Sequence, residues 1–191
     1  MLTAAFFHIA QHPNVLQNLR LELDPLMPNQ ITGHKLAELP YLNAVIKETL
    51  RFCPPALLLL PRWAMDDVEI GGCIIPKHTS VIVPNWSIFR DARYFTQPDA
   101  FIPERWLDPT FRLEQTFGKS AHLPFSTGIH SCIGQTYGLA QLEMRLTLAY
   151  WVSAFDAVLV DPNSSFEFEE HFVLSKAHCR IRAYPRDMTY V

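Results

Sequence analysis

A single cysteine between two glycines, directly ahead of a helical apolar pattern, constrains the fold of this 191-residue chain more than any other feature. The segment reads Phe125-Ser126-Thr127-Gly128-Ile129-His130-Ser131-Cys132-Ile133-Gly134. Gly128 and Gly134 permit a positive φ or a close backbone approach without a Cβ clash. A helix that begins near Ile133 would stabilise a thiolate at Cys132 through its dipole and its N–H groups. The loop therefore presents an electron-rich sulfur, which can bind a metal or attack an electrophile.

Composition and charge exclude several classes of protein. Hydrophobic residues make up 49% of the chain and charged residues 18%, which is ordinary for a globular domain. The formal net charge is −3 and the basic residues are scattered, so we expect no nucleic-acid partner. Residues 1–10 lack the basic start and cleavage site of a signal peptide. The apolar run at residues 56–60 is far shorter than the ~20 residues that span a bilayer, so we expect no membrane anchor in this chain.

Prolines and apolar spacing predict the helices. Pro13 and Pro40 suit the first turn of a helix, and Pro54 with Pro55 ends one. Apolar residues recur at intervals of three and four between these prolines and again after Cys132. The predicted helices cover residues 1–10, 13–23, 40–53 and about 139–151.

The remaining segments predict small sheets and ordered loops. Between residues 57 and 83, short runs such as Val68-Glu69-Ile70 alternate with turn signals, which indicates strands. Residues 86–123 are rich in proline and aromatic residues, so we expect short helical turns and a long ordered loop. Residues 155–184 alternate enough for two or three closing strands. The predicted fold class is mainly α with small β-sheets (α+β), in one domain over residues 1–191.

Glu48 and Arg51 stand three residues apart on the second proline-initiated helix, and therefore on one face. The plainer interpretation is a solvated surface pair, worth under about 1 kcal/mol. If the face is buried, the Arg51 guanidinium needs further partners, and the aromatic segment at residues 101–106 supplies candidates. Breaking such a buried network would cost about 3–5 kcal/mol.

Three motifs in this order resemble the C-terminal half of a cytochrome P450, most like the fungal members. They are Glu48 with Arg51 in a helix, then Pro103-Glu104-Arg105-Trp106, then Phe125, Gly128, Cys132 and Gly134 in the cysteine segment. The resemblance covers essentially the whole chain, from the end of the family's distal helix to its C-terminal strands.

The resemblance implies a haem-binding role for the cysteine loop. Cys132 would be the axial thiolate ligand of the iron in haem b, and Phe125 would pack beside its sulfur. Gly128 and Gly134 would let the loop approach the porphyrin. Gly138 stands where the family usually has alanine inside the helix after the cysteine, at a cost of ~1 kcal/mol at most.

The resemblance also implies roles for four arginine and glutamate residues and one histidine. Arg62 matches the arginine that meets a haem propionate. His130 occupies a position that is usually arginine in eukaryotic members, so its propionate contact would be more sensitive to pH. Glu48, Arg51 and Arg105 resemble the family's buried charge triad, which would hold the cysteine loop in place.

The function that the resemblance implies is O₂- and NADPH-dependent oxidation of a hydrophobic small molecule, as in secondary metabolism. Electrons would arrive from a flavoprotein reductase. A full-length relative is expected on the cytoplasmic side of the endoplasmic reticulum, held by an anchor that this chain does not contain. The segments at residues 56–60 and 171–174 correspond to edges of the family's substrate pocket.

Two alternatives stay open because the acid–alcohol pair that handles protons beside O₂ is not in this chain. The first is a catalytically inactive, truncated remnant. In it we expect a large uncovered apolar patch, formed by Leu16, Leu19, Leu50 and Leu146. The second is a haem-binding module without oxygen activation.

The remaining histidines and cysteines have plainer interpretations. His8 and His12 stand four residues apart and could mimic a zinc pair, but we expect them on a helix surface or interface. We expect Cys53, Cys73 and Cys179 to be small core residues. Without the resemblance, Cys132 could also be a protease-type nucleophile.

Overall fold

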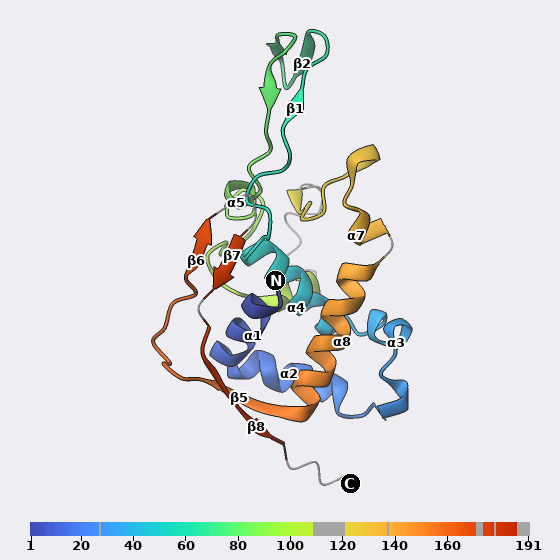
Figure 1. Cartoon of the computed structure of the whole chain (residues 1–191), viewed down its shortest axis with the longest axis vertical. Helices are drawn as coiled ribbons and strands as arrows, with labels where there is room; N and C mark the ends of the chain where they lie inside the picture. Colours follow the sequence, from blue (N-terminus) through green and yellow to red (C-terminus); the bar gives the residue numbers. More distant parts are fainter. Residues whose placement is uncertain (27, 109–120, 137, 171–173, 178, 187–191) are drawn as a thin grey trace.

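The computed structural model describes residues 1–26, 28–108, 121–136, 138–170, 174–177 and 179–186. Its centre is a group of packed helices formed by α1 (Leu2–Gln11), α2 (Pro13–Leu23), α4 (Pro40–Phe52) and α8 (Leu139–Ala154), with η1 (Pro28–Gln30) and α3 (Gly33–Ala37) between α2 and α4 (Figure 1). The facing apolar side chains form one core, with Ile9, Leu19, Leu42, Val45 and Leu148 almost fully buried.

The predicted helices begin and end where proline chemistry places their limits. Pro13 and Pro40 occupy the first turns of α2 and α4, where a missing backbone N–H costs nothing. The helix α4 ends at Phe52, two residues before Pro54. These helix predictions are confirmed.

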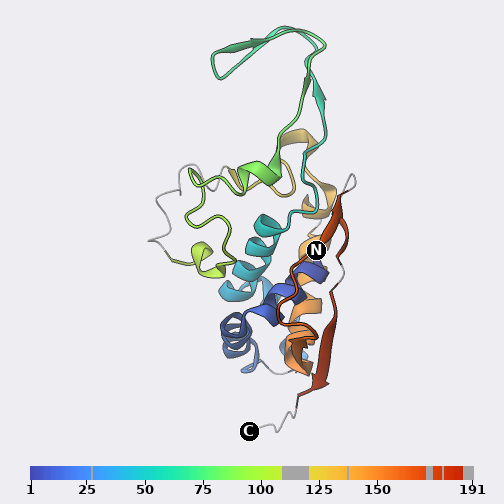
Figure 2. The same cartoon turned by 90° about the vertical axis from the view of Figure 1, so that its left-hand side faces the viewer.

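A two-stranded ribbon extends away from the helices (Figures 1 and 2). At its base β1 (Arg62–Trp63) pairs with β4 (Ser80–Val81), and at its tip β2 (Val68–Ile70) pairs with β3 (Cys73–Ile75), both antiparallel. Gly71 and Gly72, with φ of 59° and 81°, form the turn between β2 and β3. Cys73 is exposed on this ribbon, so its expected place in the core is wrong.

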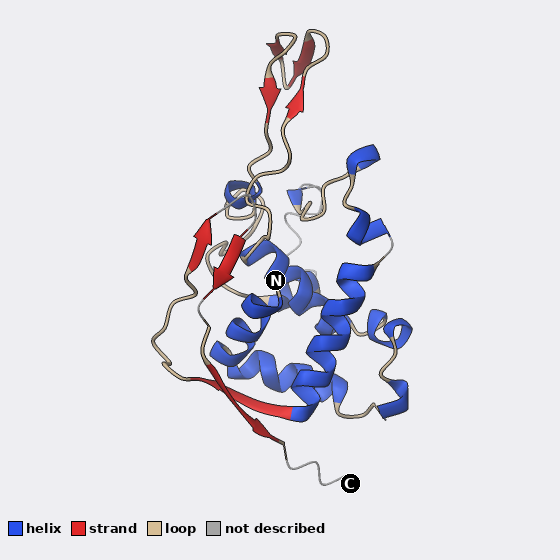
Figure 3. Ribbon diagram, viewed as in Figure 1, coloured by secondary structure: helices blue, strands red, loops and turns tan. Residues whose placement is uncertain are grey.

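The end of the chain forms two further antiparallel pairs, which lie beside the helices (Figures 2 and 3). The strand β5 (Phe155–Leu159) follows α8 directly and pairs with β8 (Ile181–Pro185). The strand β6 (Phe168–Glu170) pairs with β7 (Leu174–Ala177). The described residues thus contain four closing strands, where the sequence predicted two or three.

The segment between the ribbon and the cysteine loop contains short helical turns, as predicted. These are α5 (Asn85–Ile88) and η2 (Pro103–Trp106), joined by irregular backbone. The predicted ordered loop also covers residues 109–120, and the pocket edge at 171–174 includes residues 171–173; both stretches lie outside the described residues.

The sequence placed Gly138 inside the helix after the cysteine, and the structure shows that this placement is wrong. It lies outside both α7 (Ile133–Thr136) and α8, with φ of 67° in the left-handed region that favours glycine. The expected helix is therefore interrupted, and Gly138 relieves strain at the start of α8 instead of weakening a helix interior.

Two expectations about exposure are also wrong. The apolar patch predicted for a remnant is covered, because Leu19 and Leu50 are 0% and 3% exposed and Leu16 and Leu146 pack against the same core. His8 is buried rather than on a helix surface, since its ring lies between Phe7, Phe52 and Phe101.

No helix within the described part of the chain is long and apolar enough to cross a membrane.

Candidate functional site

Glu48 and Arg51 form a fully buried ion pair one turn apart on α4. Both side chains are 0% exposed. The Arg51 Nε and Nη2 atoms donate to the two carboxylate oxygens of Glu48 at 3.0 and 2.8 Å. The remaining guanidinium hydrogens go to backbone carbonyls of Phe89, Pro98 and Ala100 at 2.7–2.9 Å. The arginine can be buried because every donor has an acceptor.

The Glu48 carboxylate also organises the turn η2. It accepts hydrogen bonds from Arg105 Nε at 3.0 Å, from the Trp106 indole N–H at 2.9 Å and from the Ile102 backbone N–H at 2.9 Å. Arg105 is 9% exposed and donates its other hydrogens to carbonyls that include that of Thr96, at 2.7 Å. We call Glu48, Arg51, Arg105 and Trp106 the Glu48 network.

The burial of the Glu48 network excludes the surface-pair interpretation of Glu48 and Arg51. Charged hydrogen bonds hold α4 against a segment 54 to 58 residues further along the sequence. Removing one charge would leave the others buried without compensation, at a cost of about 3–5 kcal/mol.

The cysteine loop is a short, exposed turn between two structured segments. It contains η4 (Gly128–His130), and α7 begins one residue after Cys132. The Cys132 N–H donates to the Phe125 carbonyl at 2.8 Å and closes the loop. Gly128 has φ of 74°, which a residue with a side chain would adopt only with strain. Cys132 and His130 are exposed, and Phe125 is half-buried against the core.

Gly134 lies beside the sulfur of Cys132. A Cβ at this position would lie 3.5 Å from Cys132 Sγ and 3.4 Å from Ala140 Cβ. These are ordinary van der Waals distances, so the structure shows no steric clash that would exclude a Cβ here.

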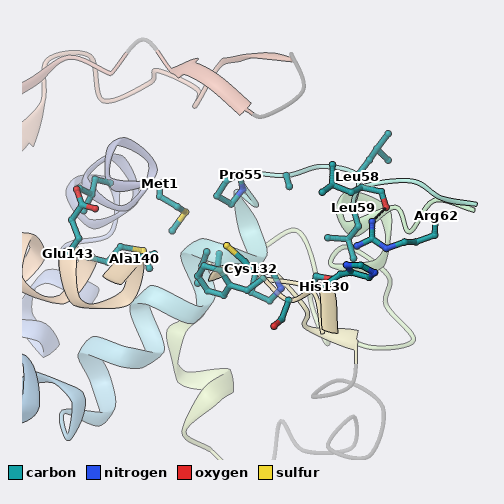
Figure 4. A pocket seen from close by; sticks show the side chains of 18 residues that line it. Met1, Pro55, Leu58, Leu59, Arg62, His130, Cys132, Ala140 and Glu143 are labelled. Carbon is teal, nitrogen blue, oxygen red and sulfur yellow. Dashed lines mark hydrogen bonds between the residues drawn. The ribbon is translucent and has the colours of Figure 1, made fainter. Parts of the chain in front are cut away.

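A cavity of about 660 Å³ lies against this loop (Figure 4). Its walls are mainly apolar and come from the start of α1, the end of α4, residues 55–62, the cysteine loop and the start of α8. Cys132 lies on the wall, Arg62 and His130 lie at one end, and Met1 and Glu143 lie at the other. Arg62 is exposed and donates to the carbonyls of Leu60 and Pro61 at 3.3 Å.

The structure thus divides the predicted residues into two groups. Glu48, Arg51 and Arg105 meet in the network. Cys132, Phe125, His130 and Arg62 line the cavity, while Gly128 and Gly134 shape the loop without lining it.

Sequence reasoning named one aromatic contributor to the network and missed another. Trp106 belongs to the segment that the sequence offered as partners of the buried pair, and its indole N–H donates to Glu48. His122 packs on Trp106, with ring centroids 4.6 Å apart, and no spacing in the sequence marks it.

The chemistry available at the cavity is that of one sulfur ligand in apolar surroundings. Within the residues that the structure describes, no group of three or more histidine, cysteine or acidic side chains is placed to hold a metal.

Comparison with known proteins agrees with this arrangement. The family model for cytochrome P450 matches residues 1–181. Cytochrome P450 monooxygenase cloA of Claviceps purpurea is 39% identical over 160 residues, 81% of this chain and 30% of that protein. Cytochrome P450 monooxygenase hkm5 of Aspergillus hancockii is 37% identical over 179 residues, 90% of this chain and 34% of that protein.

A relative from an insect matches a similar share of the chain. Probable cytochrome P450 12d1 proximal, mitochondrial, of Drosophila melanogaster is 34% identical over 181 residues, 93% of this chain and 34% of that protein. The chain thus spans about a third of the length of the curated relatives it matches. The extent of the family match and these identities show that the chain belongs to the cytochrome P450 family.

Proposed function

We propose that this chain binds haem b through Cys132. The observation that carries the proposal is the exposed thiol of Cys132 on the wall of a mainly apolar cavity of about 660 Å³. Haem b is a flat apolar macrocycle with two carboxylates, and its iron accepts a cysteine thiolate as axial ligand. Apolar walls, one sulfur and two basic side chains at one end match the chemistry of this group.

Each loop residue has a part in this proposal. Cys132 holds the iron, and Gly134 lies beside the sulfur and lets the loop approach the porphyrin. Phe125 covers the loop from the core side, and Gly128 allows the turn. Arg62 and His130 bind the propionates. Haem with a thiolate ligand supplies oxygen activation, because the thiolate pushes electron density toward O–O cleavage.

For the longer protein we propose monooxygenation of a hydrophobic small molecule, with NADPH and O₂ as co-substrates and a flavoprotein reductase as electron donor. Two fungal relatives are named cytochrome P450 monooxygenases, which supports the reaction class. The apolar cavity walls favour a hydrophobic substrate. We place the longer protein on the cytoplasmic side of the endoplasmic reticulum, and residues 1–191 as one portion of its single catalytic domain.

Haem titration of the purified chain tests the proposal. We expect saturable uptake at one haem per chain, followed by the Soret absorption. Cys132→Ala should weaken uptake at least about tenfold, a loss of ~1.4 kcal/mol. The matched control is Cys73→Ala, because Cys73 is also exposed but lies on the distant ribbon.

Equal haem affinity in the Cys132→Ala protein, or no uptake by the wild-type chain, would contradict the proposal. NADPH oxidation with a reductase and a hydrophobic substrate is measured separately. Haem uptake without turnover would support a haem-binding module rather than an enzyme.

A further inference from the structure

One face of α8 forms part of the cavity wall and carries an acidic side chain. Ala140, Glu143 and Met144 all line the cavity, and residues three and four apart lie on the same side of a helix. Figure 4 shows the Glu143 side chain at the end of the cavity opposite Arg62 and His130. Among the described residues that line the cavity, Glu143 is the one acidic residue. The mainly apolar cavity thus has an acidic end and a basic end.

The Glu143 carboxylate has no counter-charge in the described part of the chain. The residue is exposed, and none of the described residues forms a hydrogen bond or an ion pair with its side chain. Arg145, the basic residue next in sequence, donates instead to Asn43 at 2.8 Å and to Gln141 at 3.0 Å. Residues two apart on a helix do not face each other. The negative charge of Glu143 therefore acts at its end of the cavity without a neutralising partner.

Two plainer roles do not explain an acid at this position. A carboxylate in the first turn of a helix stabilises the helix dipole, but α8 begins at Leu139 and has no acidic residue in its first turn. An ion pair could stabilise the surface of the helix, but Glu143 forms none with the described residues. What distinguishes Glu143 is its place on the cavity wall, between Ala140 and Met144.

A charge at one end of the cavity can distinguish porphyrins by the position of their carboxylates. Haem b has propionates on one edge and vinyl groups on the opposite edge, whereas coprohaem has propionates on both edges. When the propionates of one edge bind Arg62 and His130, the opposite edge lies toward Glu143. A vinyl group at that end meets apolar walls. A propionate there would meet a carboxylate of like charge, which is unfavourable.

We propose that Glu143 is a specificity-determining residue of the cavity, which excludes ligands that would place an anionic group at the α8 end. The selection between porphyrins rests on the proposed function, whereas the exclusion of anions from this end does not. The favoured ligand is an apolar molecule whose anionic groups lie on one edge only, as in haem b. The disfavoured ligand carries anionic groups on opposite edges, as in coprohaem.

Titration of the purified chain with haem b and with coprohaem tests the selection. Glu143→Gln removes the charge and keeps the size of the side chain. We expect this change to raise the affinity for coprohaem about threefold, the effect of one exposed charge pair, and to alter that for haem b less than about 1.5-fold. The matched control is Glu69→Gln on β2, because Glu69 is exposed but does not line the cavity. Salt at about 1 M should reduce the gain, since it screens exposed charges.

Two fluorescent probes test the same charge in the haem-free protein. Anilinonaphthalene sulfonate is an apolar anion, and phenylnaphthylamine is its uncharged parent. In Glu143→Gln we expect the affinity for the anion, divided by that for the neutral probe, to rise about threefold. The ratio cancels any change in the cavity that affects both probes alike. Burial lowers the pKa of the Met1 α-amino group below its ordinary 8.0, so measurement at about pH 8.5 leaves this neighbouring group mainly uncharged.

The outcomes separate this inference from the proposed function. Unchanged affinities for coprohaem and for the anionic probe in Glu143→Gln, or the same gains in Glu69→Gln, would overturn the exclusion of anions. If the wild-type chain takes up no haem while Glu143→Gln raises the probe ratio, the proposed function fails and the exclusion of anions stands. If haem binds through Cys132 but Glu143→Gln changes neither selectivity, the exclusion of anions fails alone.

Discussion

The Glu48 network and the cysteine loop differ in burial and in bonding. Glu48 is fully buried and accepts hydrogen bonds from two arginines, one indole and one backbone N–H. The loop is exposed, with Ile129 at 96%, and the backbone hydrogen bond from Cys132 to Phe125 closes it. The ligand loop thus lies at the surface, whereas the Glu48 network joins distant parts of the sequence in the interior.

Glu48→Gln should break this contrast most strongly. The change leaves Arg51 and Arg105 buried beside a neutral amide, so we expect a loss of about 3–5 kcal/mol in the free energy of unfolding. Urea denaturation followed by circular dichroism measures it. Cys132→Ser in the haem-free protein should change the same quantity by no more than about 0.5 kcal/mol. Equal effects of the two substitutions would contradict the division between support and loop.

Arg105→Lys tests whether geometry or charge alone matters in the network. Lysine keeps the charge but cannot direct separate hydrogens to Glu48 and to the Thr96 carbonyl, so we expect a loss of about 1–3 kcal/mol. The control is Arg93→Lys, because Arg93 pairs with Asp91 at the surface and its side chain is 80% exposed. That change should cost less than about 1 kcal/mol. A harmless Arg105→Lys would show that charge alone suffices.

His8 makes the free energy of unfolding sensitive to acid. Burial, aided by the neighbouring His12, lowers the pKa of His8 from its ordinary 6.5 to about 3. The unfolded chain therefore takes up this proton first as the pH falls, so stability is full above pH 6.5 and declines below it. Between pH 7 and pH 5 we expect the contribution of His8 to the free energy of unfolding to fall by about 2 kcal/mol.

His8→Phe should flatten the pH dependence of unfolding by that amount, measured by urea denaturation at each pH. The control is His34→Phe, since His34 is exposed on α3. An unchanged pH profile in His8→Phe would contradict the assignment of the acid sensitivity to this residue.

Gly128→Ala is expected to have the smallest effect on stability, roughly 1 kcal/mol, because φ at this position is 74°. Gly71→Ala is a matched control, with φ of 59° on the ribbon and open space around it. Both should cost similar stability, but only Gly128→Ala should reduce haem affinity. A loss of haem affinity in Gly71→Ala would mean that the ribbon, too, supports the cavity.

The sequence predicted the helices, because prolines mark their limits and apolar residues recur at helical spacing within them. Pro13 and Pro40 mark the starts of α2 and α4, and Pro54 marks the end of α4. The glycines around Cys132 predicted that this segment forms a loop. The burial of His8 was missed because it depends on Phe101, far away in the chain.

Two other differences have the same kind of cause. Cys73 is exposed because the ribbon leaves the helices, which a three-residue apolar run cannot reveal. Gly138 interrupts the expected helix because its backbone is in the left-handed region. The helical spacing of apolar residues on either side does not predict the φ angle of the residue between them. The contacts that Trp106 and His122 make could be seen only in the folded structure, because they join residues that no spacing in the sequence relates.

The central claim is that the supported loop presents Cys132 as the thiolate ligand of haem. The most direct measurement is the absorption spectrum of the reduced, CO-bound protein. We predict the red-shifted Soret band of thiolate ligation in the wild-type and Cys73→Ser proteins, and its absence in Cys132→Ser. A wild-type protein that binds haem without this band, or a Cys132→Ser protein that keeps it, would contradict the account.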